Sequence, residues 1–311
     1  MRVTTNTFPN TLLSQISDLT TRQARLQSQA ATGQRVQLPE DDPQAMQQAL
    51  EMQTQAGALD QYSANIANLK DTTTIAYSAM KSLNTANTNA LEIATKAVGV
   101  NSQQDLDNYA SQIDTDLETA LTAANTTFRG DYIFAGSKTD KPPFEAVRDA
   151  NNKIIAVNYV GNTDQMTAEI AEGTSSEAQP IGANDSGSGA RGLIADSRYG
   201  ADYFNHLIQL RDHLKTGDTA TIANTDQTNL KTDSDNVIYH YSHIGSVQSR
   251  LDAQDSINKD QSFSLNQHVS NLVDADLADT MVKLTQVQNA YSAALQAGGR
   301  ILNTSLLDYL K

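Results

Sequence analysis

One pair of histidines in this chain has a spacing that could carry metal chemistry. His240 and His243 are three residues apart on a predicted helix, a spacing that places two imidazoles on one face, where they could bind a metal ion. No motif supplies a third ligand, and the sequence contains no HExxH segment. We therefore interpret the pair as an exposed helix face, and we expect neither a metal site nor a cofactor.

Two acidic clusters could act as paired carboxylates for hydrolysis or as ligands for a cation. One occupies residues 40–42, and the other consists of Asp274, Asp276 and Asp279. Both are predicted at helix ends or on a helix face, where no cleft encloses a substrate. Because no GxSxG, P-loop or GxGxxG motif occurs in the required strand–loop–helix context, we predict no catalytic residue and a chain that is not an enzyme.

The composition limits the partners that the chain can bind. Its 311 residues carry a formal net charge of -14 at pH 7 without a stripe of Lys and Arg, which argues against binding to nucleic acid. Cysteine is absent, which excludes disulfides, thiolate metal sites and thiol nucleophiles together. We expect no membrane insertion, because no run of about 18 apolar residues occurs. The amino terminus, MRVTTNTFPN, does not resemble a conventional signal peptide.

Both ends of the chain are predicted to be helices with apolar residues at alternating spacings of 3 and 4, which is the heptad pattern. The first helix is expected to begin after Pro9-Asn10 and to end near Gly33, and the last to follow the break at residues 274–276. Neither stripe can close a core alone, so we predict that these helices are poorly ordered in the free monomer and pack against each other and against neighbouring subunits. The predicted assembly-interface residues are Leu12, Ile16, Leu19, Leu26, Leu277, Met281, Leu284, Tyr291, Leu295, Leu302 and Leu306.

The middle of the chain combines long helices with a short β-prone region. Seams over residues 59–97, 106–128, 203–214 and 230–251 predict an internal helical bundle. Between them, DYIFAG, KIIAVNYVG and QMTAEIAEG read as strands, and residues 174–192 read as a polar loop. The expected fold is mainly α, an elongated coiled-coil helical bundle formed by both chain ends with a small β-rich insert domain in the middle. We divide the chain into terminal coiled-coil helices (1–42 and 272–311, an assembly domain), a helical bundle domain (43–128 and 201–271) and a β-rich insert domain (129–200).

The linker at residues 32–45 carries the signals of a helix start. Pro43 suits the first position of the next helix and Asp42 the cap before it, while the acids at 40–42 favour the positive end of that helix. Arg35 in the linker and Arg129 beside the β-prone region fit equally well as partners of neighbouring subunits or as intrachain ion pairs. The linker motif comprises Arg35, Pro39, Asp41, Asp42 and Pro43.

Four separated segments resemble the flagellin superfamily, and within it the hook-associated protein 3 subfamily. The resemblance covers nearly the whole chain and is carried by GQRVQLPEDDPQA (33–45), FRGDYIFAGSKTDKPPF (128–144), SNLVDADLADTMVKL (270–284) and SLLDYL (305–310). Flagellin itself is the alternative, because it shares the terminal helices and a related linker. Flagellins usually carry DDAA in the linker and tend to end in LLR, so DDPQA and LLDYLK favour the junction subfamily.

The resemblance implies a structural component of the bacterial flagellum, a hook-associated junction protein that connects hook to filament through helical subunit packing. The partners it implies are the other hook-associated junction protein, flagellin, further copies of the chain in a ring, and a cytoplasmic flagellar export chaperone. It also implies an extracellular location, reached through the flagellar type III apparatus without a cleaved signal peptide. The alternatives are a flagellin-type filament subunit, an enzyme carried on the β insert, and a secreted effector or translocator that shares only the helical termini.

Overall fold

The chain folds into two compact units. The computed structural model describes residues 7–177 and 179–309, with side chains at 10–177 and 179–300. The terminal unit comprises Met1–Ala58 and Asp260–Lys311, and the central unit comprises Leu59–Lys259. Both boundaries fall inside long helices, α2 (Pro43–Ala97) and α6 (Gln227–Val273), whereas the division expected from sequence was placed at residues 42 and 272.

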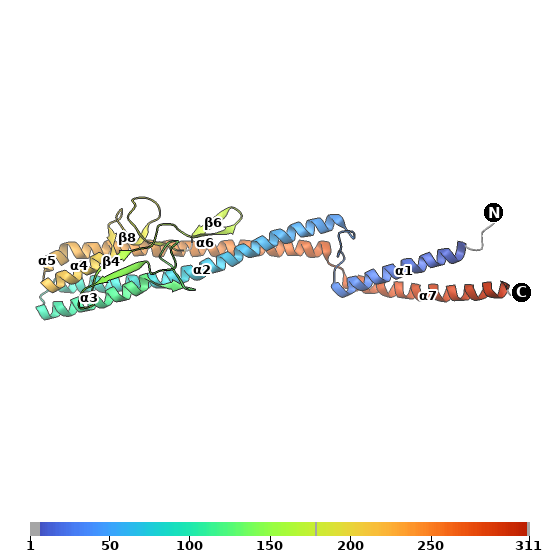
Figure 1. Ribbon diagram of the computed structural model, residues 1–311, viewed down its shortest axis with the longest axis horizontal. Coiled ribbons are helices and arrows are strands. Elements are labelled where there is room, and N and C mark those ends of the chain that lie inside the picture. Colours follow the sequence, from blue (N-terminus) through green and yellow to red (C-terminus); the bar gives the residue numbers. More distant parts are fainter. Residues whose placement is uncertain (1–6, 178, 310–311) are drawn as a thin grey trace. The chain divides into compact units, whose positions relative to one another are not determined.

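The terminal unit is built on two helices from opposite ends of the sequence, α1 (Thr7–Thr32) and α7 (Leu277–Tyr309), which lie side by side (Figure 1). α1 begins earlier than predicted, so Pro9 falls in its first turn, where a backbone amide has no helical partner in any case. Gly33 ends α1 as expected. It adopts a φ of 74° and its amide donates to the carbonyl oxygen of Gln29 at 2.9 Å.

In the central unit, α2 and α6 pack with α3 (Gln103–Ala124) and α4 (Tyr203–Thr216) around one hydrophobic core (Figure 1). The α2 seam predicted over residues 59–97 consists of the positions from Leu59 to Ala97 at alternating spacings of 3 and 4. Each of these positions is buried or half-buried, which confirms the heptad interpretation there. The side chain of Ser102 caps α3 and the left-handed Gly217 ends α4. A short helix, α5 (Thr219–Thr221), and a π-helical turn, η1 (Ile222–Asp226), lead into α6.

The prediction that α3 continues to Phe128 is wrong. The helix ends at Ala124, and Phe128 belongs to strand β1 (Thr127–Phe128). The cause is tertiary, because the side chain of Asn125 bonds to both backbone groups of Phe144 and so holds the chain out of the helix.

The strands form small separate sheets rather than one continuous sheet. Antiparallel pairs are made by β1 with β2 (Asp131–Tyr132), β3 (Phe144–Arg148) with β4 (Ile154–Tyr159), and β5 (Thr167–Ala171) with β6 (Thr174–Glu177). A three-stranded sheet places β8 (Gly192–Asp196) between β7 (Ile181–Asn184), which is parallel to it, and β9 (Ala201–Asp202), which is antiparallel. The predicted strand at DYIFAG is shorter than expected, because Ile133 and Phe134 lie in a turn that buries both side chains.

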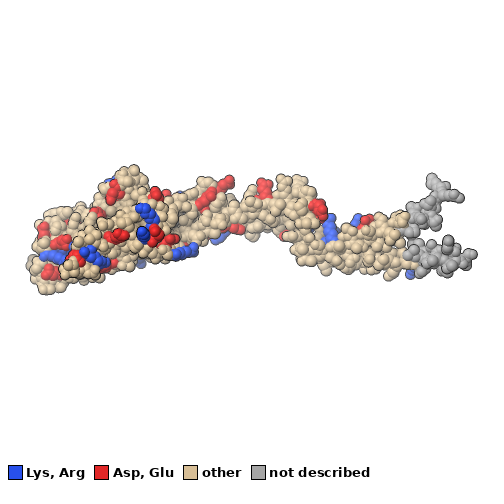
Figure 2. Space-filling view, in the orientation of Figure 1, with Lys and Arg blue, Asp and Glu red and all other residues tan. Residues whose placement is uncertain are grey.

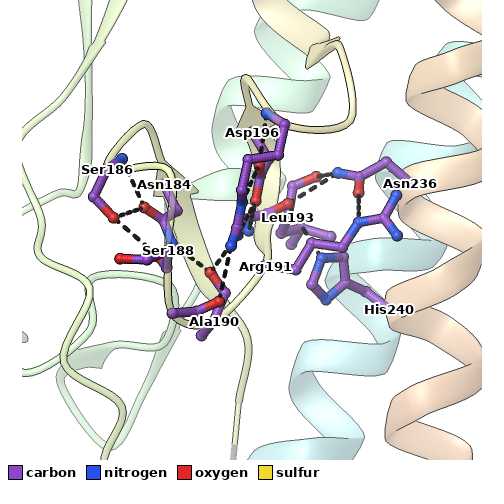
Figure 3. A network of polar contacts seen from close by, with 12 residues as sticks. Asn184, Ser186, Ser188, Ala190, Arg191, Leu193, Asp196, Asn236 and His240 are labelled. Carbon is purple, nitrogen blue, oxygen red and sulfur yellow. Dashed lines mark hydrogen bonds and ion pairs between the residues drawn. The ribbon is translucent and has the colours of Figure 1, made fainter.

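The interpretation of residues 174–192 as a polar loop is also wrong. This segment contains β6 and β7, and all four residues of β7 are buried. The following turn is ordered by Asn184, whose side-chain amide donates to the carbonyl oxygens of Ser188 and Ala190 at 2.7 and 2.6 Å and accepts from Ser186 (Figure 3). Polar composition therefore concealed a buried strand and a hydrogen-bonded turn.

The β region shares its core with the helices. Phe134, Phe144, Ile154 and Leu193 belong to the same hydrophobic cluster as the buried faces of α2, α3, α4 and α6. His240 of α6 is buried beneath β8 and bonds through Nε2 to the carbonyl oxygen of Gly192 at 3.2 Å, so the expectation of an exposed face fails for this histidine. Burial lowers the pKa of His240 to about 4. The mainly α fold with a small β-rich middle region is confirmed.

A substitution at Gly192 tests the β7–β8 packing. A Cβ atom there would lie 2.1 Å from the carbonyl oxygen of Ala195 and 2.6 Å from the amide nitrogen of Asn184, so the backbone must shift to admit it. We expect Gly192→Ala to lower the free energy of unfolding of the central unit by about 1–3 kcal/mol, measured by urea denaturation with circular dichroism. The matched control is Gly245→Ala in α6, where nothing lies within 4 Å of the new Cβ and a gain of about 0.5–1 kcal/mol is expected. Equal unfolding midpoints for the two variants would contradict this packing.

Candidate assembly interface

The contact between α1 and α7 is antiparallel and narrow. At one end, Gly298 approaches Leu12 so closely that a Cβ on the glycine would lie 2.9 Å from a Leu12 methyl carbon. At the other end, Gln34 pairs with Asp274 in an antiparallel bridge. The predicted α1 positions Leu12, Ile16, Leu19 and Leu26 are all half-buried, and none of the described side chains of α1 is fully buried.

The face of α7 that meets α1 contains only part of the predicted assembly-interface set. The buried and half-buried positions recur at spacings of 4 and 3, and they are Thr280, Leu284, Val287, Tyr291, Ala294 and Gly298. Leu284 and Tyr291 lie on this face as predicted. Three further predicted residues do not: Leu277, Met281 and Leu295 keep 51%, 53% and 48% of their surface exposed. The side chains of Leu302 and Leu306 lie outside the described residues.

Small residues explain why these positions of α7 face α1. Gly298 and Ala294 let the two helices approach closely, which large apolar side chains at the same positions would prevent. The larger side chains of Leu277, Met281 and Leu295 lie beside this face, and Val282 and Leu13 are exposed as well. Met281 and Leu295 are two heptads apart, close to four turns at about 3.6 residues per turn, so they lie along one line of α7. The face of the terminal unit visible in Figure 2 carries few charged side chains.

Residues 33–36 and 272–275 form a backbone contact, called the clasp below. It connects the linker to the junction of α6 and α7. The amides of Arg35 and Val36 donate to the carbonyl oxygen of Val273 at 2.6 and 3.2 Å, and the amide of Ala275 donates to that of Gly33 at 2.8 Å. Val36 is buried with Ala45, Ala49 and Val273 in a small apolar cluster. The clasp is therefore a backbone ladder closed by a few apolar contacts.

Both arginines whose partners the sequence left open make intrachain contacts. Arg35 donates from Nη2 to the carbonyl oxygen of Leu272 at 2.7 Å and lies 3.5 Å from a carboxylate oxygen of Asp42. Arg129 in the central unit donates to the side chain of Asn68 at 2.8 Å and lies 3.5 Å from Asp71.

The two acids of the linker motif have different partners. Asp42 accepts the amide of Ala45 at 3.1 Å, which confirms it as the cap of α2 before Pro43. Asp41 instead closes its own loop: Oδ2 accepts the amides of Gln37 and Leu38, both at 3.1 Å, and Oδ1 lies 3.1 Å from Arg25 of α1. Pro39 and Glu40 form the corner of the turn that this loop makes, because the Asp41 amide donates to the carbonyl oxygen of Leu38.

The second acidic cluster also serves a helix end. Asp276 caps α7 by accepting the amides of Ala278 and Asp279, and Asp279 pairs with Lys283 at 2.6 Å. Asp274 accepts the hydroxyl of Ser270. A groove of about 450 Å³ runs beside these residues between α1 and α7, with Arg22 and Lys283 among its lining side chains. Its acids are thus occupied as caps and ion-pair partners.

Two histidine–aspartate pairs, each with a half-buried histidine and a buried aspartate, are a polar feature that the sequence did not predict. His206 and His213 of α4 bond through Nδ1 to Asp233 and Asp226 at 2.7 and 2.8 Å. Both aspartates are buried, and each pair joins α4 to the segment that leads into α6 or to α6 itself. Residues thirteen or more apart in sequence carry no local signal for such pairing. In the described part of the chain, no three His, Asp or Glu side chains are placed to hold a metal ion. Of the helices within residues 7–309, none is long and apolar enough to span a membrane.

Replacing Leu284 tests the α1–α7 contact. Leu284 is 9% exposed, so Leu284→Ala is expected to cost about 2 kcal/mol of pairing free energy and to speed hydrogen exchange of the α1 amides. Leu295→Ala, which removes a side chain that is half exposed, is the control and should leave that exchange unchanged. Equal acceleration by both variants would contradict the observed α7 face.

An acid titration tests the loop closed by Asp41. Hydrogen bonds from the amides of Leu38 and Gln37 hold the pKa of the Asp41 carboxyl below its usual value of about 3.9. The stabilisation by this carboxylate is therefore complete above about pH 4 and is lost as the pH falls through the lowered pKa. We expect the amide proton resonances of Gln37 and Leu38 to shift in that acid range in the parent chain and to stay constant in Asp41→Asn. An unchanged titration in the variant would assign it to another group.

Comparison with known proteins gives matches at both ends of the chain. Residues 3–139 match the bacterial flagellin N-terminal helical region, and residues 223–310 match the bacterial flagellin C-terminal helical region. Flagellar hook-associated protein 3 of Escherichia coli (strain K12) is 28% identical over 297 residues, which cover 91% of each chain. The protein of the same name from Salmonella typhimurium (strain LT2) is 27% identical over 312 residues, covering 96% of this chain and 94% of that one.

The fold is shared with solved structures. A flagellar hook-associated protein from Vibrio parahaemolyticus superposes with a TM-score of 0.63 at 18% identity, over 75% of this chain and 100% of that chain. The two terminal helical matches, their order along the sequence and the relatives that align over most of the chain all indicate the same family. The chain therefore belongs to the flagellin family, in its hook-associated protein 3 branch.

Proposed function

We propose that this chain is a structural subunit of the bacterial flagellum that connects the hook to the filament at their junction. The observation that carries the proposal is that the α1–α7 pair leaves several large apolar side chains exposed. Leu13, Leu277, Met281, Val282 and Leu295 remain about half exposed or more on helices that match the terminal regions of flagellin. Such a surface is suited to contact with other subunits.

Repetition of one such contact builds a ring. A head-to-tail interface related by a rotation that closes gives a ring of identical copies, without requiring any copy to be symmetric itself. Burying the remaining surface of each half-exposed apolar side chain stabilises the contact by on the order of 1 kcal/mol. The partners in this proposal are further copies of the chain on either side, with the other hook-associated junction protein and flagellin above and below.

We also propose that the chain has no catalytic activity and acts outside the cell. The acids of the terminal unit cap helices or pair with Lys and Arg, and the two His–Asp pairs of the central unit join helices rather than line an open site. Export unfolded through the flagellar type III apparatus, without a cleaved signal peptide, suits a chain without cysteine, because no disulfide must be reduced first. An export chaperone that covers the apolar flank of α7 before assembly belongs to the same proposal.

A flagellin-type filament subunit is the second candidate, since both family matches are to flagellin regions. Quantitative mass spectrometry of purified flagella separates the two functions. A fixed number of copies for each flagellum supports the junction role, whereas a copy number that grows with filament length would make the chain a filament subunit.

Introducing a charge on the exposed flank of α7 tests the interface. Leu295→Asp places a carboxylate where the proposed contact is dry, so we expect loss of junction assembly and of motility, with the unfolding of the central unit unchanged. The matched control is Val100→Asp, a fully exposed side chain of the central unit, which should assemble normally. Normal junctions built from Leu295→Asp would exclude this flank from the interface.

A further inference from the structure

A polar recess in the central unit is lined by none of the exposed apolar residues of α1 and α7 described above. It has a volume of about 340 Å³ and lies between α6 and the segments that flank β7. Its lining includes Glu177, Gln179, Arg191, Tyr239, His240 and His243. Polar groups from three stretches of sequence thus converge on one space large enough for a small organic ligand.

Arg191 is held in one orientation at this recess. Its guanidinium lies 3.7 Å from the centre of the Tyr199 ring and 4.3 Å from that of the Tyr239 ring. Its Nε donates to Oδ1 of Asn236 at 2.6 Å (Figure 3). Asn236 is itself 1% exposed and fixed, because its amide donates to the carbonyl oxygens of Gly192 and Leu193 at 2.9 and 2.7 Å.

The terminal nitrogens of Arg191 remain open. Among the described residues, no carboxylate lies within 4 Å of this guanidinium, and its Nη atoms donate to no protein group. The neighbouring Arg198 shows the contrast, since it pairs with Asp196 at 2.6 Å and donates to two backbone carbonyl oxygens. In a chain with a net charge of -14, a half-buried cation without an acidic partner is an anion site prepared in advance.

His240 adds an acceptor beside this cation. Its Nε2 bonds to the carbonyl oxygen of Gly192, and the ring is neutral at pH 7 because burial lowers its pKa to about 4. The other ring nitrogen therefore carries a lone pair, and it has no hydrogen-bond partner in the described part of the chain. A hydroxyl group next to a bound anion would satisfy it.

We propose that this recess binds a carboxylate group through the two Nη atoms of Arg191, with the His240 imidazole accepting from a hydroxyl on the same ligand where one is present. The flat guanidinium offers two parallel donors, which match the two oxygens of a carboxylate. The carboxylate comes either from a small hydroxy acid, such as a sugar acid, or from an Asp or Glu side chain of an adjacent subunit. Binding to the isolated chain does not depend on the proposed junction role.

The first arm of the test titrates the full-length monomer with D-glucuronate and follows the Arg191 Nε–H and His243 ring resonances by NMR. We expect saturable shifts with a dissociation constant on the order of 1 mM, no response to uncharged D-glucose, and at least a tenfold weaker response in Arg191→Gln. The matched control is Arg148→Gln, which removes the same charge from a pair with Glu118 at another surface of the central unit and should bind as the parent does.

The second arm compares junction assembly in cells that express Arg191→Gln or Arg148→Gln. Glucuronate binding that only Arg191→Gln abolishes supports a free acid as the ligand. Absence of glucuronate binding, together with an assembly defect confined to Arg191→Gln, supports an acidic side chain of an adjacent subunit. Equal glucuronate binding by both variants, or no binding and no assembly difference, overturns the proposal.

Discussion

The antiparallel packing of α1 on α7 is the contact on which the terminal unit depends. It joins two segments from opposite ends of the sequence, and neither helix has enough apolar surface to form a core without the other. None of the described side chains of α1 is buried, and among the described residues of α7 only Thr280, Leu284 and Gly298 are buried. A pair packed through small residues gains close approach at the cost of apolar area, so its larger side chains remain at the surface. The small residues that let α1 and α7 pack closely therefore leave larger apolar side chains exposed, where other subunits can contact them.

Hydrogen bonds at one end of this pair give it a unique register. A seam with apolar residues at spacings of 3 and 4 changes little when one helix slides by seven residues, so apolar contacts alone specify the alignment weakly. The clasp at residues 33–36 and 272–275 cannot slide, because its backbone donors and acceptors match at one alignment. Asp41 holds the loop behind the clasp by accepting two amides with one carboxylate oxygen. Directional bonds thus set the alignment that the apolar stripe then stabilises.

Local patterns in the sequence predicted the helices, their caps and the central seam, because each depends on residues within a few turns of one another. Gly33 and Asp42 act through their own backbone or the next turn. The misses all depend on distant residues. β7 is buried because it pairs with β8 and packs against Phe134, Phe144 and Tyr159. α3 stops at Ala124 because Asn125 binds Phe144. On α7, the small residues Gly298 and Ala294 occupy the contact with α1, so the predicted interface residues Leu277, Met281 and Leu295 lie outside that contact and their role between subunits stays a prediction.

The two units differ in how their interiors are specified, and this difference explains why one is suited to fold alone and the other to assemble. The central unit buries polar side chains that bond across the core: Asn87 to the carbonyl oxygen of Leu230, Tyr203 to that of Leu83, and Arg211 to Asp114. Each such group is costly to bury unless its partner is in place, so these bonds favour one arrangement over its near alternatives. Between α1 and α7 the contact is mostly small and apolar, and the backbone hydrogen bonds of the clasp lie at one end of it. An interface of that kind tolerates new neighbours along its flank, since adding apolar contacts there breaks no existing hydrogen bond.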